Sequence, residues 1–119
     1  MRMCEVLLFS GNVRKMADFY KNVLQLPDDC EDDKIQIFQV EDIKIVIYND
    51  GKRKPNNNQN ISLSFTVSDI DAEYERLRNS FKSRIHFLET PHTLENGCRI
   101  MSFYDPDGNQ VYFRNETEE

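Results

Sequence analysis

A pattern of strand, helix cap and helix occurs twice in the sequence, 57 residues apart. Residues 4–9 and 61–67 are rich in apolar and β-branched side chains, as strands are. A good helix-capping residue follows each of them, and apolar residues then recur at helical spacing. The aligned pairs are Leu8 with Phe65, Asn12 with Asp69, Val13 with Ile70 and Tyr20 with Leu77. Self-similarity at a fixed spacing indicates a duplicated structural unit.

Further strands are predicted in each copy. In the first copy, where Pro27 marks the predicted end of the helix, residues 34–40 and 43–49 predict a hairpin. The acidic stretch 28–33 before this hairpin is either an extra edge strand or a loop. In the second copy, strands are predicted at residues 84–89, 98–105 and 109–115.

The stretch 50–60 is polar and has no apolar residue, so we expect it to be an exposed linker. It separates module one, at about 3–49, from module two, at about 61–115. A chain of 119 residues is long enough for one compact domain, and we expect residues 1–119 to form a single α+β domain of these two modules.

Composition excludes several functional classes. With 15 basic and 21 acidic side chains, the formal net charge of −6 disfavours a protein that follows nucleic-acid phosphates. No apolar run approaches the roughly 20 residues of a membrane span, and we expect no secretory signal. The three cysteines are odd in number and contain no CxxC pair, which favours reduced thiols and a cytoplasmic location.

The stretch Phe103 to Asn109 reads FYDPDGN. Pro106 presets φ at the first corner of a turn, and Gly108 supplies the positive φ that closes a hairpin. The vicinal oxygen chelate superfamily ends its second module in a similar Phe-x-Asp-Pro-Asp-Gly-Asn turn. Its first module has an Asp-Leu cap, then Phe-Tyr and Leu-Gly-Leu, which are matched here by Asn12-Val13, Phe19-Tyr20 and Leu24-Gln25-Leu26.

From residue 3 to about 115 the chain therefore resembles this superfamily of glyoxalases, extradiol dioxygenases, fosfomycin-resistance transferases and bleomycin-resistance proteins. The resemblance implies two tandem βαβββ modules that form an open, curled, mixed sheet with helices on one face and a concave cup on the other. Alternation along the strands then sorts the side chains. Those predicted to face the helices are Val6, Leu8, Leu63, Phe65, Val111 and Phe113. Those predicted to face the cup are Glu5, Leu7, Phe9, Ile43, Ile45, Ile47, Ser62, Ser64, Thr66, Gln110, Tyr112 and Arg114.

Metal-dependent members of the superfamily hold a divalent ion in the cup with side chains drawn from His, Glu and Gln. The resemblance places the four ligand positions on Glu5, Ile45, Ser62 and Tyr112. Ile45 has no donor atom, Ser62 is a poor ligand at neutral pH, and the Tyr112 phenol would need a large fall in its pKa from about 10. Since only Glu5 is a natural ligand, we expect no metal and no other cofactor.

A cup without a metal is expected to be an apolar basin with a few polar anchors, as small-molecule sites are. The predicted ligand-binding residues are Glu5, Leu7, Phe9, Ile45, Ile47, Ser62, Ser64, Gln110, Tyr112 and Arg114. We expect a metal-independent small-molecule binding protein of the glyoxalase/bleomycin-resistance type, which sequesters a drug or a metabolite. Two alternatives stay open: the same side chains could plug the cup, or the chain could be a glyoxalase-like lyase or isomerase or a dioxygenase-related enzyme. In a metal-free enzyme, Glu5 would be the general base and Tyr112 the general acid.

The expected partners are a small-molecule ligand and a second copy of the chain, with no nucleic acid and no membrane. The resemblance implies a homodimer, and the linker 50–60 is long enough for modules to be exchanged between two chains. His86 and His92 lie on either side of Glu89 in the sequence. They could bind a metal at the surface or be ordinary exposed histidines.

Overall fold

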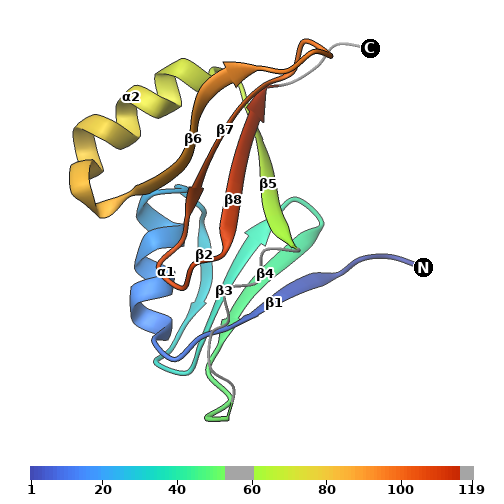
Figure 1. Cartoon of the computed structure of the whole chain (residues 1–119). Coiled ribbons are helices and arrows are strands. Elements are labelled where there is room, and N and C mark those ends of the chain that lie inside the picture. Colours follow the sequence, from blue (N-terminus) through green and yellow to red (C-terminus); the bar gives the residue numbers. More distant parts are fainter. Residues whose placement is uncertain (53–60, 116–119) are drawn as a thin grey trace. The chain divides into compact units, whose positions relative to one another are not determined.

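The computed structural model describes residues 1–52 and 61–115, so most of the predicted linker 50–60 lies outside the described residues. The chain divides into two compact units. Each unit has the same order of elements: a strand, a helix and then three strands (Figure 1). The α+β class and the two predicted βαβββ modules are therefore confirmed.

The first unit contains β1 (Glu5–Phe9), α1 (Val13–Asn22), β2 (Asp28–Glu31), β3 (Ile35–Val40) and β4 (Ile43–Tyr48). Its four strands form a mixed sheet in the order β1-β4-β3-β2. β1 and β4 are parallel, and the other two pairs are antiparallel. The acidic stretch 28–33, which was predicted to be either an extra edge strand or a loop, thus contains an edge strand.

The second unit contains β5 (Ser62–Val67), α2 (Ile70–Phe81), a 3₁₀ turn η1 (Lys82–Arg84), β6 (His86–Thr93), β7 (Arg99–Tyr104) and β8 (Gln110–Asn115). Its sheet repeats the topology of the first, in the order β5-β8-β7-β6. β6 is longer than predicted and continues through Pro91. A proline is tolerated there because β6 is an edge strand, and its pairing with β7 shifts register twice.

Both helices begin at the predicted caps. The Asn12 side chain accepts a hydrogen bond from the backbone N–H of Lys15, and the Asp69 side chain accepts one from that of Ala72, each at 3.1 Å. These bonds satisfy donors that have no partner within the helix. α1 ends earlier than its predicted proline stop, because Gln25 takes a left-handed φ of 57° and turns the chain.

In the second unit, a chain of aromatic rings identifies the face of the sheet that packs on α2. Tyr74 of α2 contacts Phe87 at 5.1 Å between ring centroids, and Phe87 contacts Phe103 at 6.4 Å. Phe103 contacts Phe113 at 5.2 Å, and Phe113 contacts Phe65 at 6.5 Å. The prediction that the side chains face the helix is therefore confirmed for Leu63, Phe65, Val111 and Phe113.

In the first unit, the strand register corrects part of the predicted sorting. The Phe38 ring lies 6.2 Å from the Tyr20 ring of α1, so Phe38 is on the helix side. Ile45 is the register partner of Phe38 and of Val6, and it is only 4% exposed. Because neighbouring partners in a sheet point to the same face, Ile45 faces the helix. The predicted orientation toward the cup is therefore wrong for Ile43, Ile45 and Ile47.

The predicted hairpin turn between β7 and β8 is present, and a buried carboxylate holds it. Gly108 has φ of 87°, and its N–H donates to the Asp105 carbonyl at 2.9 Å. Asp105, 3% exposed, accepts through Oδ1 from the N–H groups of Asp107 (3.0 Å) and Asn109 (2.9 Å). Its Oδ2 accepts from the Asn109 amide at 2.8 Å. This turn sets the start of β8, the strand that carries Tyr112.

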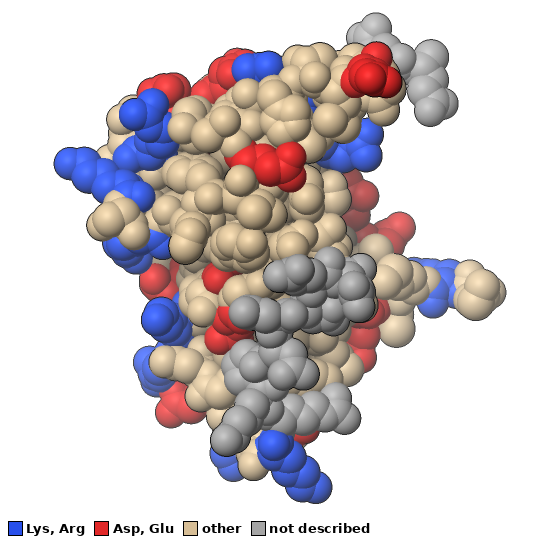
Figure 2. Space-filling model, in the orientation of Figure 1, with Lys and Arg blue, Asp and Glu red and all other residues tan. Residues whose placement is uncertain are grey.

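On the face seen in Figure 2, Lys and Arg side chains are interspersed with Asp and Glu side chains, and no extended basic patch is visible among the described residues. Within the same residues, no helix has the length and apolar character needed to cross a membrane.

Candidate functional site

The face of the second sheet that points away from α2, its helix-free face, carries rows of polar side chains. In the middle row, Ser64 of β5 lies opposite Tyr112 of β8, and Tyr112 lies opposite Ser102 of β7. Ser102 lies opposite Glu89 of the edge strand β6. The predicted binding residues of this module, which are Ser62, Ser64, Gln110, Tyr112 and Arg114, all share this face.

Tyr112 lies at the centre of a group of polar side chains. Its phenol lies beside Glu89 and Ser102, which both act on its pKa, and the Ser102 hydroxyl donates to Glu89 Oε1 at 3.2 Å. Burial raises the pKa of the Tyr112 phenol above its ordinary value of 10.0, and the Glu89 carboxylate raises it further. Tyr112 is therefore a neutral phenol at physiological pH, with a hydroxyl that is able to donate a hydrogen bond.

Glu89 connects this group to a histidine. Its Oε2 lies 3.4 Å from His92 Nε2, while the other ring nitrogen of His92, Nδ1, lies 2.8 Å from the Thr90 carbonyl oxygen. The Glu89 side chain is 34% exposed and that of His92 is 44% exposed, so solvent reaches both. Tyr112, Ser102, Glu89 and His92 form what is called the Tyr112 cluster below. It contains a hydroxyl donor, a carboxylate and an imidazole on one continuous surface.

Two further rows flank the Tyr112 cluster on the same face. On one side, Gln110 lies opposite Ser62 and Tyr104, and the Tyr104 ring contacts His86 at 5.6 Å. His86 thus makes an edge-to-face contact with a tyrosine ring, and it is separate from the Glu89–His92 pair. On the other side, Arg114 donates from Nη2 to the sulfur of buried Cys98 at 3.3 Å.

The helix-free face of the first sheet is mainly apolar. Leu7, Val46 and Ile37 form one row across β1, β4 and β3, and Phe9 and Tyr48 form part of the next. The Phe9 and Tyr48 rings lie 6.3 Å apart. Leu7 is 45% exposed and Tyr48 is 37% exposed, so apolar side chains on this face are accessible to solvent. The predicted wall residues Leu7 and Phe9 belong to this face, whereas Ile45 and Ile47 do not.

The duplicated topology also relocates one of the family's metal-ligand positions. In the second module, the position on β8 lies two residues past the partner of the position on β5. In the first module, the partner of Glu5 on β4 is Lys44. The residue two positions after Lys44 is Val46, so the equivalent ligand position is Val46 and not Ile45. Val46 has no donor atom and is 5% exposed, so the correction leaves this position without a ligand.

The residues present do not fit a divalent metal ion. Glu5 is an exposed carboxylate, but Val46 offers no lone pair and the Ser62 hydroxyl is a poor ligand at neutral pH. The raised pKa of Tyr112 opposes formation of a tyrosinate ligand. Among the side chains that the structure describes, in residues 1–27, 32–52 and 61–115, no three of His, Cys, Asp or Glu come close enough to hold a metal, and this includes the stretch from His86 to His92.

The prediction from sequence missed Glu89 and Ser102 as members of the site. Both lie on strands that were predicted, but Ser102 lies opposite Tyr112 through the pairing of β7 with β8, and Glu89 lies opposite Ser102 through the pairing of β6 with β7. The pairing of β6 with β7 contains register shifts between Phe87 and Glu89 and between Glu89 and His92. Alternation along one strand carries no information about such shifts, so only the paired strands could reveal the cluster.

Solved structures with the same fold span nearly the whole chain. A protein of unknown function from Agrobacterium tumefaciens str. C58 is 18% identical, with a TM-score of 0.82 over 98% of this chain and 95% of that one. A member of the glyoxalase/bleomycin resistance protein/dioxygenase superfamily from Sphaerobacter thermophilus DSM 20745 is 21% identical, with a TM-score of 0.77 over 98% of each chain. A lactoylglutathione lyase from Agrobacterium tumefaciens is 19% identical, with a TM-score of 0.70 over 96% of this chain and 92% of that one.

A search of curated protein sequences finds no match. The sequence model of the glyoxalase-like domain matches residues 3–116, which is nearly the whole chain. This match agrees with the duplicated βαβββ topology and with the turn that Asp105 holds. The chain therefore belongs to the glyoxalase-like domain family, within the vicinal oxygen chelate superfamily that its sequence resembles.

Proposed function

We propose that this protein binds a small molecule without the help of a metal ion, and that the Tyr112 cluster is the polar part of its binding surface. The observation that carries the proposal is that a neutral phenol occupies a position where metal-dependent relatives have a ligand, beside the hydrogen-bonded pair of Ser102 and Glu89. Hydrogen-bonded groups of fixed orientation are what small-molecule sites use to select a ligand.

The chemistry of the cluster indicates the kind of ligand. The Tyr112 ring offers an aromatic surface, and the Glu89 carboxylate offers a negative charge that is partly exposed. A ligand with a cationic or hydrogen-bond-donating group beside a planar ring would use both features. One structural neighbour belongs to a superfamily named in part for bleomycin resistance, which supports sequestration of a drug or metabolite as the role proposed here.

A thermal-shift screen of the purified protein against small molecules, including cationic antibiotics, tests the proposal. A ligand that binds only the native state stabilises it by about 2.7 kcal/mol at a hundredfold excess over Kd. Tyr112→Phe should reduce the shift that a hit produces. Tyr74→Phe is the matched control, because Tyr74 lies on α2 and contacts Phe87 on the other face of the sheet. A hit that shifts both variants as strongly as the wild type would show that the cluster does not bind it.

A second candidate function is proton-transfer catalysis without a metal. The carboxylate that raises the pKa of Tyr112 is Glu89, so Glu89 and not Glu5 would be the base, with Tyr112 as the acid. Because one structural neighbour is a lactoylglutathione lyase, turnover of lactoylglutathione is a direct assay. Activity that Glu89→Gln abolishes would favour this candidate over simple binding. Activity that survives the substitution would rule out the Glu89 mechanism.

Homodimerisation, which the superfamily resemblance implies, is proposed as the state of the protein in solution. Light scattering over a series of protein concentrations measures it directly. A mass equal to that of one 14.1 kDa chain at every concentration would contradict it.

A further inference from the structure

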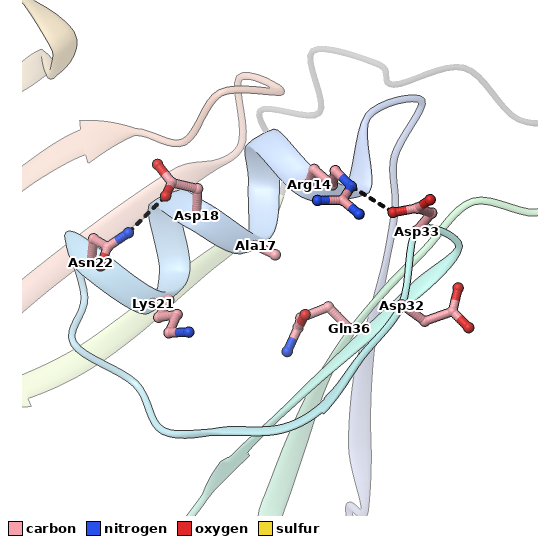
Figure 3. A pocket seen from close by; sticks show the side chains of 8 residues that line it. All are labelled: Arg14, Ala17, Asp18, Lys21, Asn22, Asp32, Asp33 and Gln36. Atoms are coloured by element: carbon pink, nitrogen blue, oxygen red, sulfur yellow. Dashed lines mark hydrogen bonds and ion pairs between the residues drawn. The ribbon is translucent and has the colours of Figure 1, made fainter.

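The first unit contains a second candidate site, on the helix side of its sheet and away from the helix-free face. A hollow of about 600 Å³ opens between α1 and the β2–β3 hairpin (Figure 3). Its size falls within the range of roughly 300–1,000 Å³ typical of small-molecule pockets. The residues that line it are Arg14, Ala17, Asp18, Lys21, Asn22, Asp32, Asp33 and Gln36.

Gln36 is the residue that points to a ligand. It lies on β3 opposite Ile47, on the face that packs on the helix, and only 2% of it is exposed. Its side chain projects from the strand toward Ala17 and Lys21 of α1 (Figure 3). The side-chain nitrogen Nε2 is buried and has no hydrogen-bond partner among the described residues. A buried amide without a partner costs stability, and an acceptor oxygen in the hollow would remove that cost.

The rim of the hollow carries charges of both signs. At one end, Arg14 Nε donates to Asp33 Oδ1, which joins the first turn of α1 to the β2–β3 hairpin. At the other end, Asp18 accepts from the Asn22 amide at 2.7 Å. Lys21 lines the same end. The floor is therefore an amide donor, and cations and carboxylates both surround it.

We propose that this hollow binds a small zwitterion, that is, a free amino acid or a short peptide. A carboxylate oxygen of the ligand accepts from Gln36 Nε2 at the floor, near the positive charges of Arg14 and Lys21. The ligand's ammonium group faces the carboxylates of the rim, of which Asp18 lies on α1 and Asp33 on the hairpin. Complementary charges at both ends of the ligand give the site its selectivity.

This proposal is independent of the Tyr112 cluster, which belongs to the other unit, so either can fail without the other. Titration of the ¹⁵N-labelled full chain with alanine, glutamate, lysine and alanyl-alanine, followed by NMR, tests it. At least one of these should give saturable shifts at the Ala17 backbone and the Gln36 side-chain amide. Acetate and methylamine, which carry only one of the two charges, should bind about tenfold more weakly.

Two variants identify the donor. Gln36→Leu should weaken binding of the zwitterion about tenfold, the usual worth of one hydrogen bond to a charged group, without lowering the urea midpoint of the free protein. Gln39→Leu is the matched control, because Gln39 lies on the same strand but on the other face, where its amide donates to the Glu41 carbonyl. It should bind as the wild type does.

Three outcomes would overturn the proposal. The first is that none of the four zwitterions, at millimolar concentration, shifts the NMR signals of Ala17 and Gln36. The second is equal affinity of Gln36→Leu and the wild type. The third is binding of acetate or methylamine as tight as that of the zwitterion, which would show that one charge alone is recognised.

Discussion

Replacement of Asp105 by alanine tests whether one buried carboxylate sets the geometry of the turn before the Tyr112 strand. Asp105 is 3% exposed and accepts two backbone hydrogen bonds and one from the Asn109 amide. In Asp105→Ala, the N–H groups of Asp107 and Asn109 lose their acceptor. Each lost partner costs about 1–3 kcal/mol when the donor stays out of water. Both sites are only partly buried, so we expect a total loss of about 2–4 kcal/mol in the free energy of unfolding.

Equilibrium unfolding in urea, followed by circular dichroism, measures this loss through the midpoint at an unchanged slope. Asp105→Asn keeps one oxygen as acceptor and should cost about 1 kcal/mol. Asp32→Ala is the matched control. The Asp32 carboxylate also accepts a hydrogen bond from a backbone N–H two residues later, that of Lys34, at 2.8 Å, but Asp32 is exposed. It should change stability by no more than about 0.5 kcal/mol. If Asp105→Ala costs no more than Asp32→Ala, the carboxylate does not hold the turn.

Three further perturbations test the electrostatics and the core. The hydrogen bond from Arg99 lowers the pKa of Asp71 below its ordinary 3.8, so this pair stabilises the fold above that pH and the contribution is lost as pH falls through the lowered value. Asp71→Asn should therefore flatten the acid dependence of the urea midpoint, and an unchanged dependence would contradict the pairing. Because burial and then Glu89 raise the pKa of Tyr112, Glu89→Gln should move that pKa down toward 10.0. The pKa of Tyr112 is measured by titrating tyrosinate absorbance with and without the Tyr112→Phe substitution and taking the difference. A Tyr112 pKa that Glu89→Gln leaves unchanged would refute the contact between Glu89 and Tyr112. Tyr112 stabilises the fold below pH 10.0, and this part is lost as pH rises through the raised value. Leu77→Ala, at a fully buried position of α2, should lower the free energy of unfolding by about 2–5 kcal/mol in the same urea assay, whereas a loss near zero would contradict its place in the core.

Local chemistry made much of the fold predictable. Asn12 and Asp69 are good caps because their short side chains reach the N–H groups that a helix leaves unpaired, and both caps are confirmed. The turn was predictable because Gly108 can adopt a φ of 87° without a steric penalty. These signals need no knowledge of distant residues.

The face of the sheet to which a side chain points could be predicted correctly only where the two faces of the strand differ in polarity. In β5 and β8, polar and apolar residues alternate, so the face of Tyr112 was predicted correctly. In β4, the run from Ile43 to Tyr48 is β-branched or aromatic at nearly every position, so both faces are apolar. The choice between Ile45 and Val46 for the helix-free face then follows from pairing with β1 and β3, which the strand itself does not encode.

The duplication, the helix caps, the closing turn and hence the family could be predicted from the amino-acid sequence, because each depends on residues close together in the chain. Which side chains meet depends on the folded chain: Glu89 lies near Tyr112 across bulged strands, and the Gln36 amide nitrogen is buried on the α1 side with no partner among the described residues. The alternation along a strand specifies only that its side chains form two sets, one on each face of the sheet. Only hydrogen-bond register between strands, together with packing of the helix on one face, specifies where each set points and what it contacts.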